Sequence, residues 1–311
     1  MELLEKINCL KREKDAAILA HYYTVSQVQD AADCVGDSLA LAQQAVKLRN
    51  KLLVVCGVHF MGETVKILSP DKKVLLPDMN AGCSLAESCD YAAFKRFVDD
   101  HKGYTVVSYV NTSAAVKSLT DICCTSGNAL AIVNSLPASE KILFAPDRNL
   151  GDYIKTQAGR KDMVVWDGAC HVHEQFSVEK IVELKKQYPN AKVLAHPECK
   201  KPVLILADKV GSTAALLKYS QVSDDREFIV ATEPGIIYQM QRSNPQKIFI
   251  PAPPADSTCG CNDCEFMKLI TLEKLYLCLK NESPEIAVEE SLRRKAEKSI
   301  VRMLEMSKNL G

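Results

Sequence analysis

The sequence predicts an α/β protein built from three similar units around one shared site. Three apolar, strand-like runs each end in a ring-bearing side chain, at His21, Tyr109 and His196. Successive rings lie 88 and 87 residues apart, and a fixed period of this kind indicates an internal repeat. The thiols Cys83 and Cys170 keep the same period, because 87 residues separate them. Three units in phase favour a pseudo-threefold arrangement.

Each unit is expected to alternate strands with helices. The expected strands, three per unit, are residues 17–21, 52–56 and 73–77; 105–109, 141–145 and 162–166; and 192–196, 227–231 and 247–251. Such alternation predicts parallel sheets covered by helices on both faces, a three-layer αβα arrangement. The units are placed at residues 1–84, 85–171 and 172–264. The helical patterns of residues 2–14 and 265–311 have no strand of their own, and we expect them to pack on the first unit.

A hydroxyl side chain lies seventeen residues after each ring, near a glycine and at the start of an Ala- and Leu-rich stretch. These hydroxyls belong to Ser38, Ser126 and Thr213. Side chains of this type cap the first N–H groups of a helix. A helix start with a hydroxyl also binds carboxylate or phosphate. Three such positions predict an anion site, which would let a chain without net charge hold a multiply charged substrate.

The composition is that of a globular protein without a basic field. Of 311 residues, 47% are hydrophobic, and 39 Lys and Arg balance 39 Asp and Glu, which argues against nucleic acid or a membrane as partner. No apolar run approaches the roughly 20 residues of a membrane span, and residues 1–15 are too charged for a signal peptide, so a cytoplasmic location is expected.

The thirteen cysteines are not expected to form a disulfide framework, because disulfides are rare in the cytoplasm. Those in apolar patterns, such as Cys9, Cys34, Cys56 and Cys278, are expected in the core.

The third strand of each unit leads into a thiol. In the second unit an apolar run stops at an Asp-Gly turn, and Cys170, His171 and His173 follow. This is how α/β folds present ligands at the carboxyl edge of a sheet. The first unit has Cys83, and the third has a Cys-x-Cys-x-x-Cys loop, a metal-binding pattern by itself, made of Cys259, Cys261 and Cys264. One thiolate per unit predicts a metal centre on the pseudo-threefold axis.

Two kinds of metal centre fit three thiolates. A 4Fe–4S cluster with three cysteine ligands keeps one iron open as a Lewis acid, whereas a fully ligated cluster only transfers electrons. Zinc with three thiolates is the alternative. The repeat spacing favours Cys259 as third ligand, since it lies 63 residues after the ring of its unit, against 62 and 61 in the first two units.

The third unit also brings an imidazole and a carboxylate together at a strand end. His196 is followed by a proline, which favours an extended exit from the strand, and then by Glu198. An imidazole and a carboxylate two residues apart can share proton-transfer work. The alternative is a solvated loop in which neither group meets a substrate.

Eleven stretches of the chain match one known family. They are AHYYT (20–24), GDSLALA (36–42), CGVHFMGETVKIL (56–68), LPDMNAGCSLA (76–86), SYVNTSAAVK (108–117), APDRNLG (145–151), WDGACHVHE (166–174), AHPEC (195–199), VGSTAALL (210–217), ATEPGI (231–236) and CNDCEFMKLITLEKL (261–275). On these motifs the chain resembles the quinolinate synthases over essentially its whole length. The resemblance implies three αβα domains around one 4Fe–4S cluster. It also implies condensation of iminoaspartate with dihydroxyacetone phosphate, which releases phosphate and water and gives quinolinate for de novo NAD biosynthesis.

The same resemblance implies particular site residues. The cluster ligands would be Cys83, Cys170 and Cys264, although Glu265 stands where the family often has proline. The substrate would be bound by His21, Ser38, Tyr109, Asn111, Ser126, His196, Glu198, Ser212 and Thr213. The catalytic groups would be Glu198 and His196, which would move protons, Tyr23 and Tyr109, which would close over carbonyl intermediates, and His173.

Two other classes of function stay open on the residues alone. One is an electron-transfer or metal-storage protein that uses the same thiols, although it would not need three hydroxyl-bearing helix starts. The other is a zinc hydrolase of triplicated fold. For the synthase, the expected partners are the two small-molecule substrates and the L-aspartate oxidase that supplies iminoaspartate.

Overall fold

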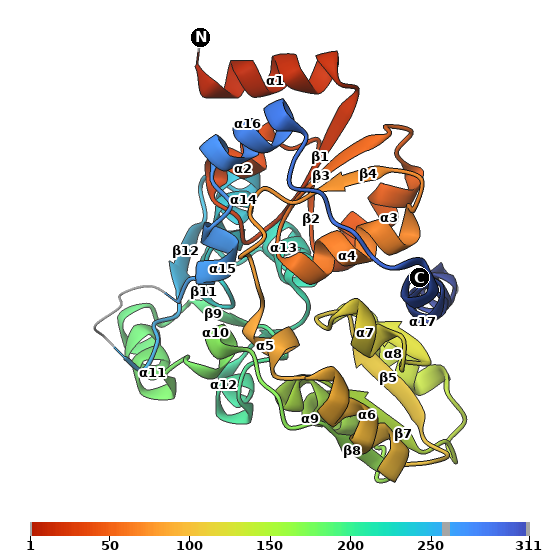
Figure 1. Cartoon of the computed structure of the whole chain (residues 1–311). Coiled ribbons are helices and arrows are strands. Elements are labelled where there is room, and N and C mark those ends of the chain that lie inside the picture. Colours follow the sequence, from red (N-terminus) through yellow and green to blue (C-terminus); the bar gives the residue numbers. More distant parts are fainter. Residues whose placement is uncertain (1, 257–261, 309–311) are drawn as a thin grey trace.

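The computed structural model describes residues 2–256 and 262–308. Their strands form three separate four-stranded sheets, with the orders β2-β1-β3-β4, β6-β5-β7-β8 and β10-β9-β11-β12. Every pairing within the sheets is parallel. Figure 1 shows the sheets in chain order, from red and orange through yellow to green and cyan. The predicted α/β class with three parallel-sheet units is confirmed.

The three sheets repeat one strand pattern. The strands are β1 (Ala16–His21), β2 (Cys34–Gly36), β3 (Leu52–Cys56), β4 (Lys73–Leu75), β5 (Thr105–Tyr109), β6 (Ile122–Cys124), β7 (Ile142–Ala145), β8 (Met163–Val165), β9 (Lys192–Ala195), β10 (Lys209–Val210), β11 (Glu227–Ala231) and β12 (Ile248–Pro251). The central strands β1 and β3 are buried at every position, as expected for a parallel sheet covered on both faces.

Each sheet contains a short edge strand that the sequence analysis missed. These strands, β2, β6 and β10, have two or three residues, which is too short to give a hydrophobic period. They fix where the hydroxyl side chains lie. Gly36 pairs with His21, so Ser38 follows two residues beyond the carboxyl end of β1. The same pairing of Cys124 with Tyr109 brings Ser126 to the corresponding edge of the second sheet.

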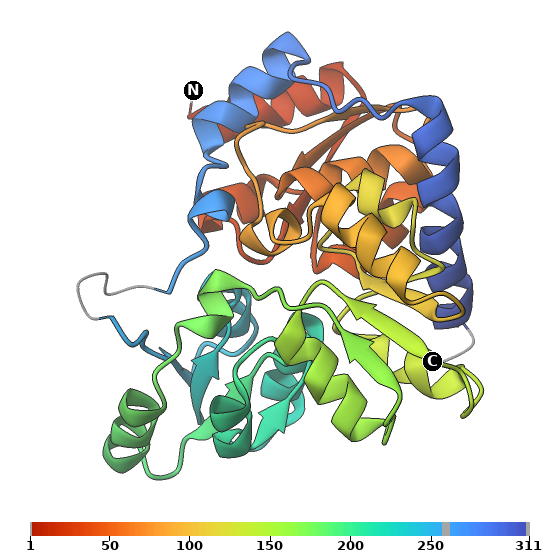
Figure 2. The same ribbon diagram turned by 60° about the horizontal axis from the view of Figure 1, so that its bottom comes forward.

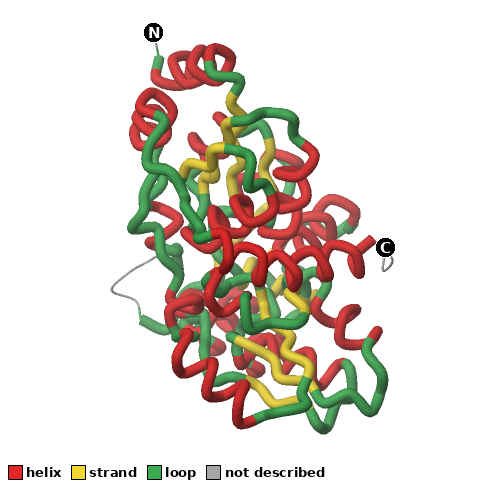
Figure 3. Tube along the Cα trace, turned by 45° about the vertical axis from the view of Figure 1, so that its right-hand side comes forward, coloured by secondary structure: helices red, strands yellow, loops and turns green. Residues whose placement is uncertain are grey.

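Helices cover the sheets (Figure 2), and in Figure 3 the strands lie in separate groups with helices around them. They are α1 (Leu3–Glu13), α2 (Ser26–Ala31), α3 (Ser38–Lys47), α4 (His59–Leu68), α5 (Ser84–Glu87), α6 (Tyr91–Asp100), α7 (Ala114–Lys117), α8 (Ala129–Ser135), α9 (Arg148–Gln157), α10 (His171–Glu174), α11 (Val178–Gln187), α12 (Lys201–Leu206), α13 (Thr213–Val222), α14 (Ile236–Ser243), α15 (Glu265–Lys268), α16 (Leu272–Asn281) and α17 (Glu290–Lys308). In the part of the chain that is described, no helix is both long and apolar enough to cross a membrane.

Two of the three hydroxyls expected at helix starts occupy that position. Ser38 and Thr213 are the first residues of α3 and α13, and the residue before each caps the helix. Asp37 accepts a hydrogen bond from the N–H of Ala40 at 2.9 Å. Ser126 differs, because it lies in a turn and α8 begins only at Ala129.

The C-terminal helices contact two units. α16 packs on α1 and α2 of the first unit, whereas α17 packs on α4 of the first unit and on α7, α8 and β6 of the second. Figure 2 shows α17, in dark blue, running along both. The assignment of residues 265–311 to the first unit therefore describes α16 but leaves out the contacts of α17 with the second unit. The unit boundaries themselves stay a prediction.

Cysteines occupy different depths of the fold. Cys56 and Cys278 are buried, as expected of core thiols. Cys34 is half-buried, and Cys9 is exposed on α1, so the core prediction was wrong for Cys9. The helical period of α1 explains this, because its single buried residue is Ile7 and Cys9 lies two positions further round the helix.

Candidate active site

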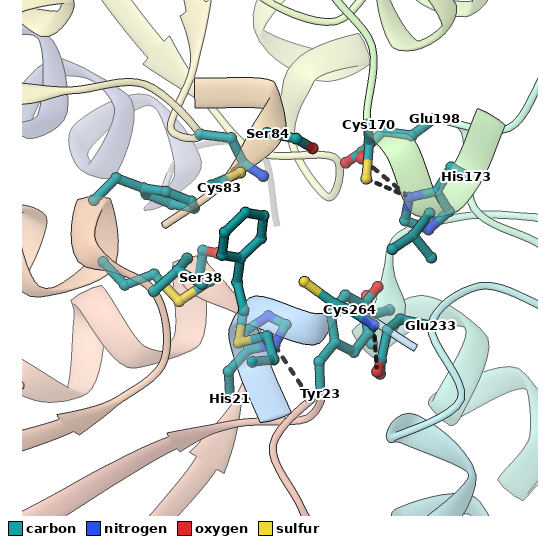
Figure 4. A pocket seen from close by; sticks show the side chains of 18 of the residues that line it. His21, Tyr23, Ser38, Cys83, Ser84, Cys170, His173, Glu198, Glu233 and Cys264 are labelled. Carbon is teal, nitrogen blue, oxygen red and sulfur yellow. Dashed lines mark hydrogen bonds and ion pairs between the residues drawn. The ribbon is translucent and has the colours of Figure 1, made fainter. Parts of the chain in front are cut away.

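One pocket receives residues from all three sheets, and about 700 Å³ inside it is free of protein atoms. The pocket lies at the carboxyl ends of strands β1, β5 and β9, because the ring residue at the end of each strand, His21, Tyr109 or His196, lines it. The sequence-predicted residues that line it are His21, Tyr23, Ser38, Cys83, Tyr109, Asn111, Ser126, Cys170, His173, His196, Glu198, Thr213 and Cys264. Figure 4 shows side chains from different parts of the chain pointing into this shared space.

Ser212 is the one predicted site residue that does not line the pocket. It is buried, and its hydroxyl accepts a hydrogen bond from the N–H of Ala215 at 3.3 Å, which makes it the cap of α13. Its neighbour Thr213 takes the place in the wall. The structure therefore gives Ser212 a capping role, and of the two predicted hydroxyls only that of Thr213 belongs to the pocket wall.

Three thiols face one another across the pocket. Cys83, Cys170 and Cys264 are each the residue directly before a short helix, α5, α10 or α15. Figure 4 shows their sulfur atoms directed into the common space. The other two members of the Cys-x-Cys-x-x-Cys loop, Cys259 and Cys261, lie outside the described residues. Of the candidates for third ligand, Cys264 is thus the one that the structure describes in the pocket wall.

Burial dominates the protonation of these thiols. It raises the pKa of Cys83 to about 12 and that of Cys264 to about 11, although backbone N–H groups of the following helical turn act in the opposite direction. Burial likewise raises the pKa of Cys170. Metal binding would exchange these protons for a cation, which removes the cost of a buried thiolate charge. The three thiols are soft donors suited to iron–sulfur or zinc.

A buried carboxylate lies between two imidazoles. Glu198 is 3% exposed, and its oxygens lie 3.2 Å from Nδ1 of His173 and 3.6 Å from Nδ1 of His196. Burial works against ionisation of Glu198, but electrostatic interaction with His196 and His173 and hydrogen bonds from His173 and Tyr109 lower its pKa below the usual value. Nδ1 of His173 is also 3.2 Å from Sγ of Cys170, so thiol, imidazole and carboxylate form a group that could ligate a metal ion.

The imidazoles of the first and third units are held in their neutral form. Burial lowers the pKa of His21 and of His196 to about 3. Nε2 of His196 lies 3.1 Å from the hydroxyl of Ser126, and Nδ1 of His21 accepts a hydrogen bond from the N–H of Tyr23. Neutral rings can act as hydrogen-bond donors and acceptors toward a substrate without adding charge to the pocket.

Two polar atoms in the wall have no partner among the described residues. They are Oδ1 of Asn111 and Oγ1 of Thr125, and both residues line the pocket. Unpaired buried polar atoms carry a cost that a ligand can remove. Asn111 was predicted from the sequence, whereas Thr125 was missed because only its neighbour Ser126 keeps the repeat spacing.

An ion pair behind the third thiol also escaped the sequence analysis. Glu233 follows β11, its side chain has no exposed area, and one oxygen lies 2.6 Å from Nζ of Lys268 on α15. The same oxygen accepts from the N–H of Cys264 at 3.3 Å, and Lys268 also donates to the carbonyl of Tyr23 at 2.8 Å. The pair therefore ties the third unit to α15 and to the first unit. In the sequence Glu233 stood out only as a member of the ATEPGI motif (231–236).

A further contact joins the first two units beside their thiols. Ser84 and His171 each follow a pocket cysteine directly, and the serine hydroxyl lies 2.7 Å from Nδ1 of the imidazole. Both residues line the pocket. Their position next to Cys83 and Cys170 is a signal that could have identified them from the sequence.

Comparison with known protein families and curated proteins agrees with this geometry. A family model described as Quinolinate synthetase A protein matches residues 5–305. A quinolinate synthase of Thermosynechococcus vestitus is 57% identical over 307 residues, which cover 99% of this chain and 96% of the relative. The chain belongs to the quinolinate synthetase A family.

Other quinolinate synthases are similarly close. The protein of Microcystis aeruginosa is 57% identical over 306 residues, covering 98% of this chain and 95% of the relative. That of Chloroherpeton thalassium is 54% identical over 308 residues, covering 99% and 95%. The resemblance to quinolinate synthases inferred from eleven motifs is therefore confirmed across the chain, whereas the electron-transfer and zinc-hydrolase alternatives find no support.

The buried ion pair of this family member yields a prediction on pH. Burial raises the pKa of Glu233 from 4.5 to about 7, against the opposing effect of Lys268. The folded state thus binds this proton more tightly than the unfolded state, and the group's contribution to stability is lost as pH rises from about 4.5 through 7, by about 3 kcal/mol. Glu233→Gln cannot ionise, so its Tm relative to the parent should rise between pH 5 and pH 8, measured by calorimetry.

Glu183→Gln, which changes an exposed carboxylate on α11, is the control and should show a constant Tm difference from the parent. If the difference for Glu233→Gln is equally constant, Glu233 does not titrate in this range.

Proposed function

We propose that the chain is a quinolinate synthase that condenses iminoaspartate with dihydroxyacetone phosphate and releases phosphate and water. The observation that carries the proposal is the meeting of one thiol per unit with hydroxyls, imidazoles and a carboxylate in a single buried pocket, in a chain that belongs to this family. An electron-transfer protein would have no use for a pocket of this polarity beside its thiols.

The proposed cofactor is a 4Fe–4S cluster held by Cys83, Cys170 and Cys264. The donor set fits, because three buried thiols with raised pKa values meet in a wall that also contains Phe60 and Met61. When bound through three cysteines, such a cluster supplies an open iron that acts as a Lewis acid for a departing hydroxyl. The side chains around it are proposed to bind, orient and protonate the substrates.

Substrate anions are proposed to bind at hydroxyls and helix starts. Ser38 and Thr213 open the ten-residue helices α3 and α13, whose first N–H groups favour negative charge. Ser126 adds a hydroxyl from the second unit, held against His196. Asn111 and Thr125 offer unpaired oxygen atoms to substrate hydroxyl or amine groups. Neutral imidazoles complete a site that recognises carboxylate and phosphate by hydrogen bonds.

Glu198 is proposed to move protons during enolisation and dehydration, with His196, His173, Tyr23 and Tyr109 as further catalytic groups. Its carboxylate is buried, ionised, and hydrogen-bonded by His173 and Tyr109, so it can accept a proton from carbon and return it to a leaving hydroxyl. The cytoplasm as location, and the L-aspartate oxidase that makes iminoaspartate as partner, belong to the same proposal.

The central test is an assay for quinolinate on protein purified without oxygen, with iron and sulfide analysis. The parent should carry four irons per chain and form quinolinate from iminoaspartate and dihydroxyacetone phosphate. Cys83→Ala, Cys170→Ala and Cys264→Ala should each lose most of the iron and all activity, because a buried cluster with two thiolates is under-ligated. Cys9→Ala and Cys278→Ala, which lie outside the pocket, should keep both. Iron retained in Cys264→Ala but lost in Cys259→Ala would reassign the third ligand.

A second prediction concerns the anion site. Ser38→Ala, Ser126→Ala and Thr213→Ala should each weaken the binding of substrate or quinolinate about ten- to hundredfold, because a charge-assisted hydrogen bond contributes roughly 1.5–3 kcal/mol. The cluster absorption should not change. Ser220→Ala is the matched control, since this buried hydroxyl of α13 donates to the carbonyl of Leu217 inside the helix. Unchanged affinity in all three pocket variants would contradict the proposed anion site.

A third prediction concerns Glu198. Glu198→Gln keeps the shape of the side chain and removes the base, so turnover should fall by a factor on the order of 10²–10⁴. Cluster content and quinolinate binding should be retained. Exposed Glu183→Gln serves as the control, with turnover like the parent. If turnover of Glu198→Gln stays within about tenfold of the parent, the carboxylate only braces the loop.

A further inference from the structure

A lysine without exposed surface lies behind the pocket wall. Lys117 is the last residue of α7, and its side chain is fully buried. It does not line the pocket, but its Nζ lies 5.4 Å from the ring centre of Phe60, which does. Burying an amino group of this kind costs free energy unless hydrogen bonds compensate. The hydrogen-bond partners of Lys117 therefore indicate what the chain gains from it.

Those partners are two backbone carbonyls, one on either side of a site residue. Nζ donates to the carbonyl of Val110 at 2.8 Å and also to the carbonyl of Thr112. The residue between them is Asn111, which lines the pocket and whose Oδ1 has no partner among the described residues. Lys117 thus holds the backbone before and after Asn111 without itself belonging to the pocket wall.

The backbone at Asn111 forms a tight turn soon after the end of β5. The N–H of Thr112 donates to the carbonyl of Val110 at 2.8 Å, and a bond between residues two apart defines a γ-turn with Asn111 at its centre. The hydroxyl of Thr112 donates to the carbonyl of Tyr109 at 3.1 Å. Because a turn of three residues closes with one backbone hydrogen bond, contacts from outside fix the direction of its central side chain. Lys117 supplies two such contacts.

The lysine reaches this turn from an anchored position. The hydroxyl of Ser299 on α17 is buried and donates to the carbonyl of Lys117 at 3.2 Å. At the start of α7, the carboxylate of Glu63 on α4 accepts from the N–H of Ala114 at 2.9 Å. A helix of one turn has little stability of its own, so these contacts with α4 and α17 fix the base of the lysine side chain.

We propose that Lys117 is a positioning residue for substrate binding, which orients Asn111 by holding the carbonyls before and after it; this inference rests on the proposed synthase function. A methionine of similar size would fill the same space, so packing alone does not require an amino group here. Its N–H groups give the turn fixed partners and leave Oδ1 of Asn111 unpaired for a substrate hydroxyl or amine. The lysine thereby acts on substrate only through Asn111.

The test replaces Lys117 by methionine, which keeps the bulk and removes both hydrogen bonds. In holoenzyme, Lys117→Met should raise the dissociation constant of quinolinate and the KM for substrate about tenfold, because Asn111 is no longer held. Its kcat should stay within about threefold of the parent, as expected when only uniform binding is lost, and its iron content should not change. Lys72→Met is the matched control, since Lys72 also donates to two carbonyls, those of Ala45 and Leu48, and lies outside the pocket; its quinolinate affinity should equal that of the parent.

A double mutant tests whether the lysine acts through Asn111. Asn111→Ala alone should raise the dissociation constant of quinolinate about tenfold. Adding Lys117→Met should then change it little further, whereas independent contributions would multiply. The proposal is overturned by parent-like quinolinate affinity in Lys117→Met or by multiplicative losses in the double mutant. A lower Tm with unchanged affinity would assign the lysine a folding role only.

Lys117→Gln covers the case in which the methionine variant does not fold. Its side chain is one bond shorter and loses at least one of the two carbonyl contacts, so a higher dissociation constant and the same non-additivity with Asn111→Ala are expected. Failure of both variants to fold would overturn the proposal in favour of a folding role. A parent enzyme that neither forms nor binds quinolinate would instead refute the synthase function.

Discussion

The structure depends on the way three parallel sheets direct their carboxyl ends at one buried pocket. Loops at such edges carry the polar side chains of α/β folds, and here three sets of them line one pocket, where many of their polar groups are buried. Buried polar groups must pair, so many of the pairs cross from one unit to another. His196 meets Ser126, Tyr23 meets Thr213 and Thr232, and Ser84 meets His171. These cross-unit bonds assemble the site and hold the units in register.

The wall of the pocket, as far as the structure describes it, contains no cluster of basic side chains. Among the described residues that line it there is no Lys or Arg. Lys268 lies just behind the wall, but its ammonium is engaged by Glu233 and by the carbonyl of Tyr23. Burial keeps His21 and His196 neutral. In the proposed function, recognition of anions therefore falls to hydroxyls, helix N-termini and neutral rings, which agrees with a chain whose formal net charge is zero.

Sequence periodicity predicted the parts of this arrangement that repeat. The ring, hydroxyl and thiol of each unit keep fixed spacing, which predicted the α/β class and one shared site. The full set of fourteen expected site residues came from the resemblance to the quinolinate synthases, and thirteen of the fourteen line the pocket. What breaks the repeat was missed. Thr232, Glu233 and Lys268 act across units at positions without counterparts, and the edge strands β2, β6 and β10 are too short to carry a period. Ser212 lies one residue before the repeat position of Thr213, and its hydroxyl caps its own helix.

The thiols and the polar groups of the pocket are not independent elements. Each cysteine stands directly before a single-turn helix, and that turn carries a polar group engaged elsewhere in the site: Ser84 after Cys83, His173 after Cys170 and Lys268 after Cys264. Such short helices have little stability of their own. The position of each short helix therefore depends on the ligand of the thiol before it and on the partner of its polar side chain. Glu198 is such a partner for His173, and Glu233 for Lys268. Any ligand that binds the three thiols only in the folded arrangement stabilises that arrangement by its own binding free energy. Ligand binding at the three thiols is consequently coupled to the positions of Ser84, His173 and Lys268, because the same three helical turns carry both.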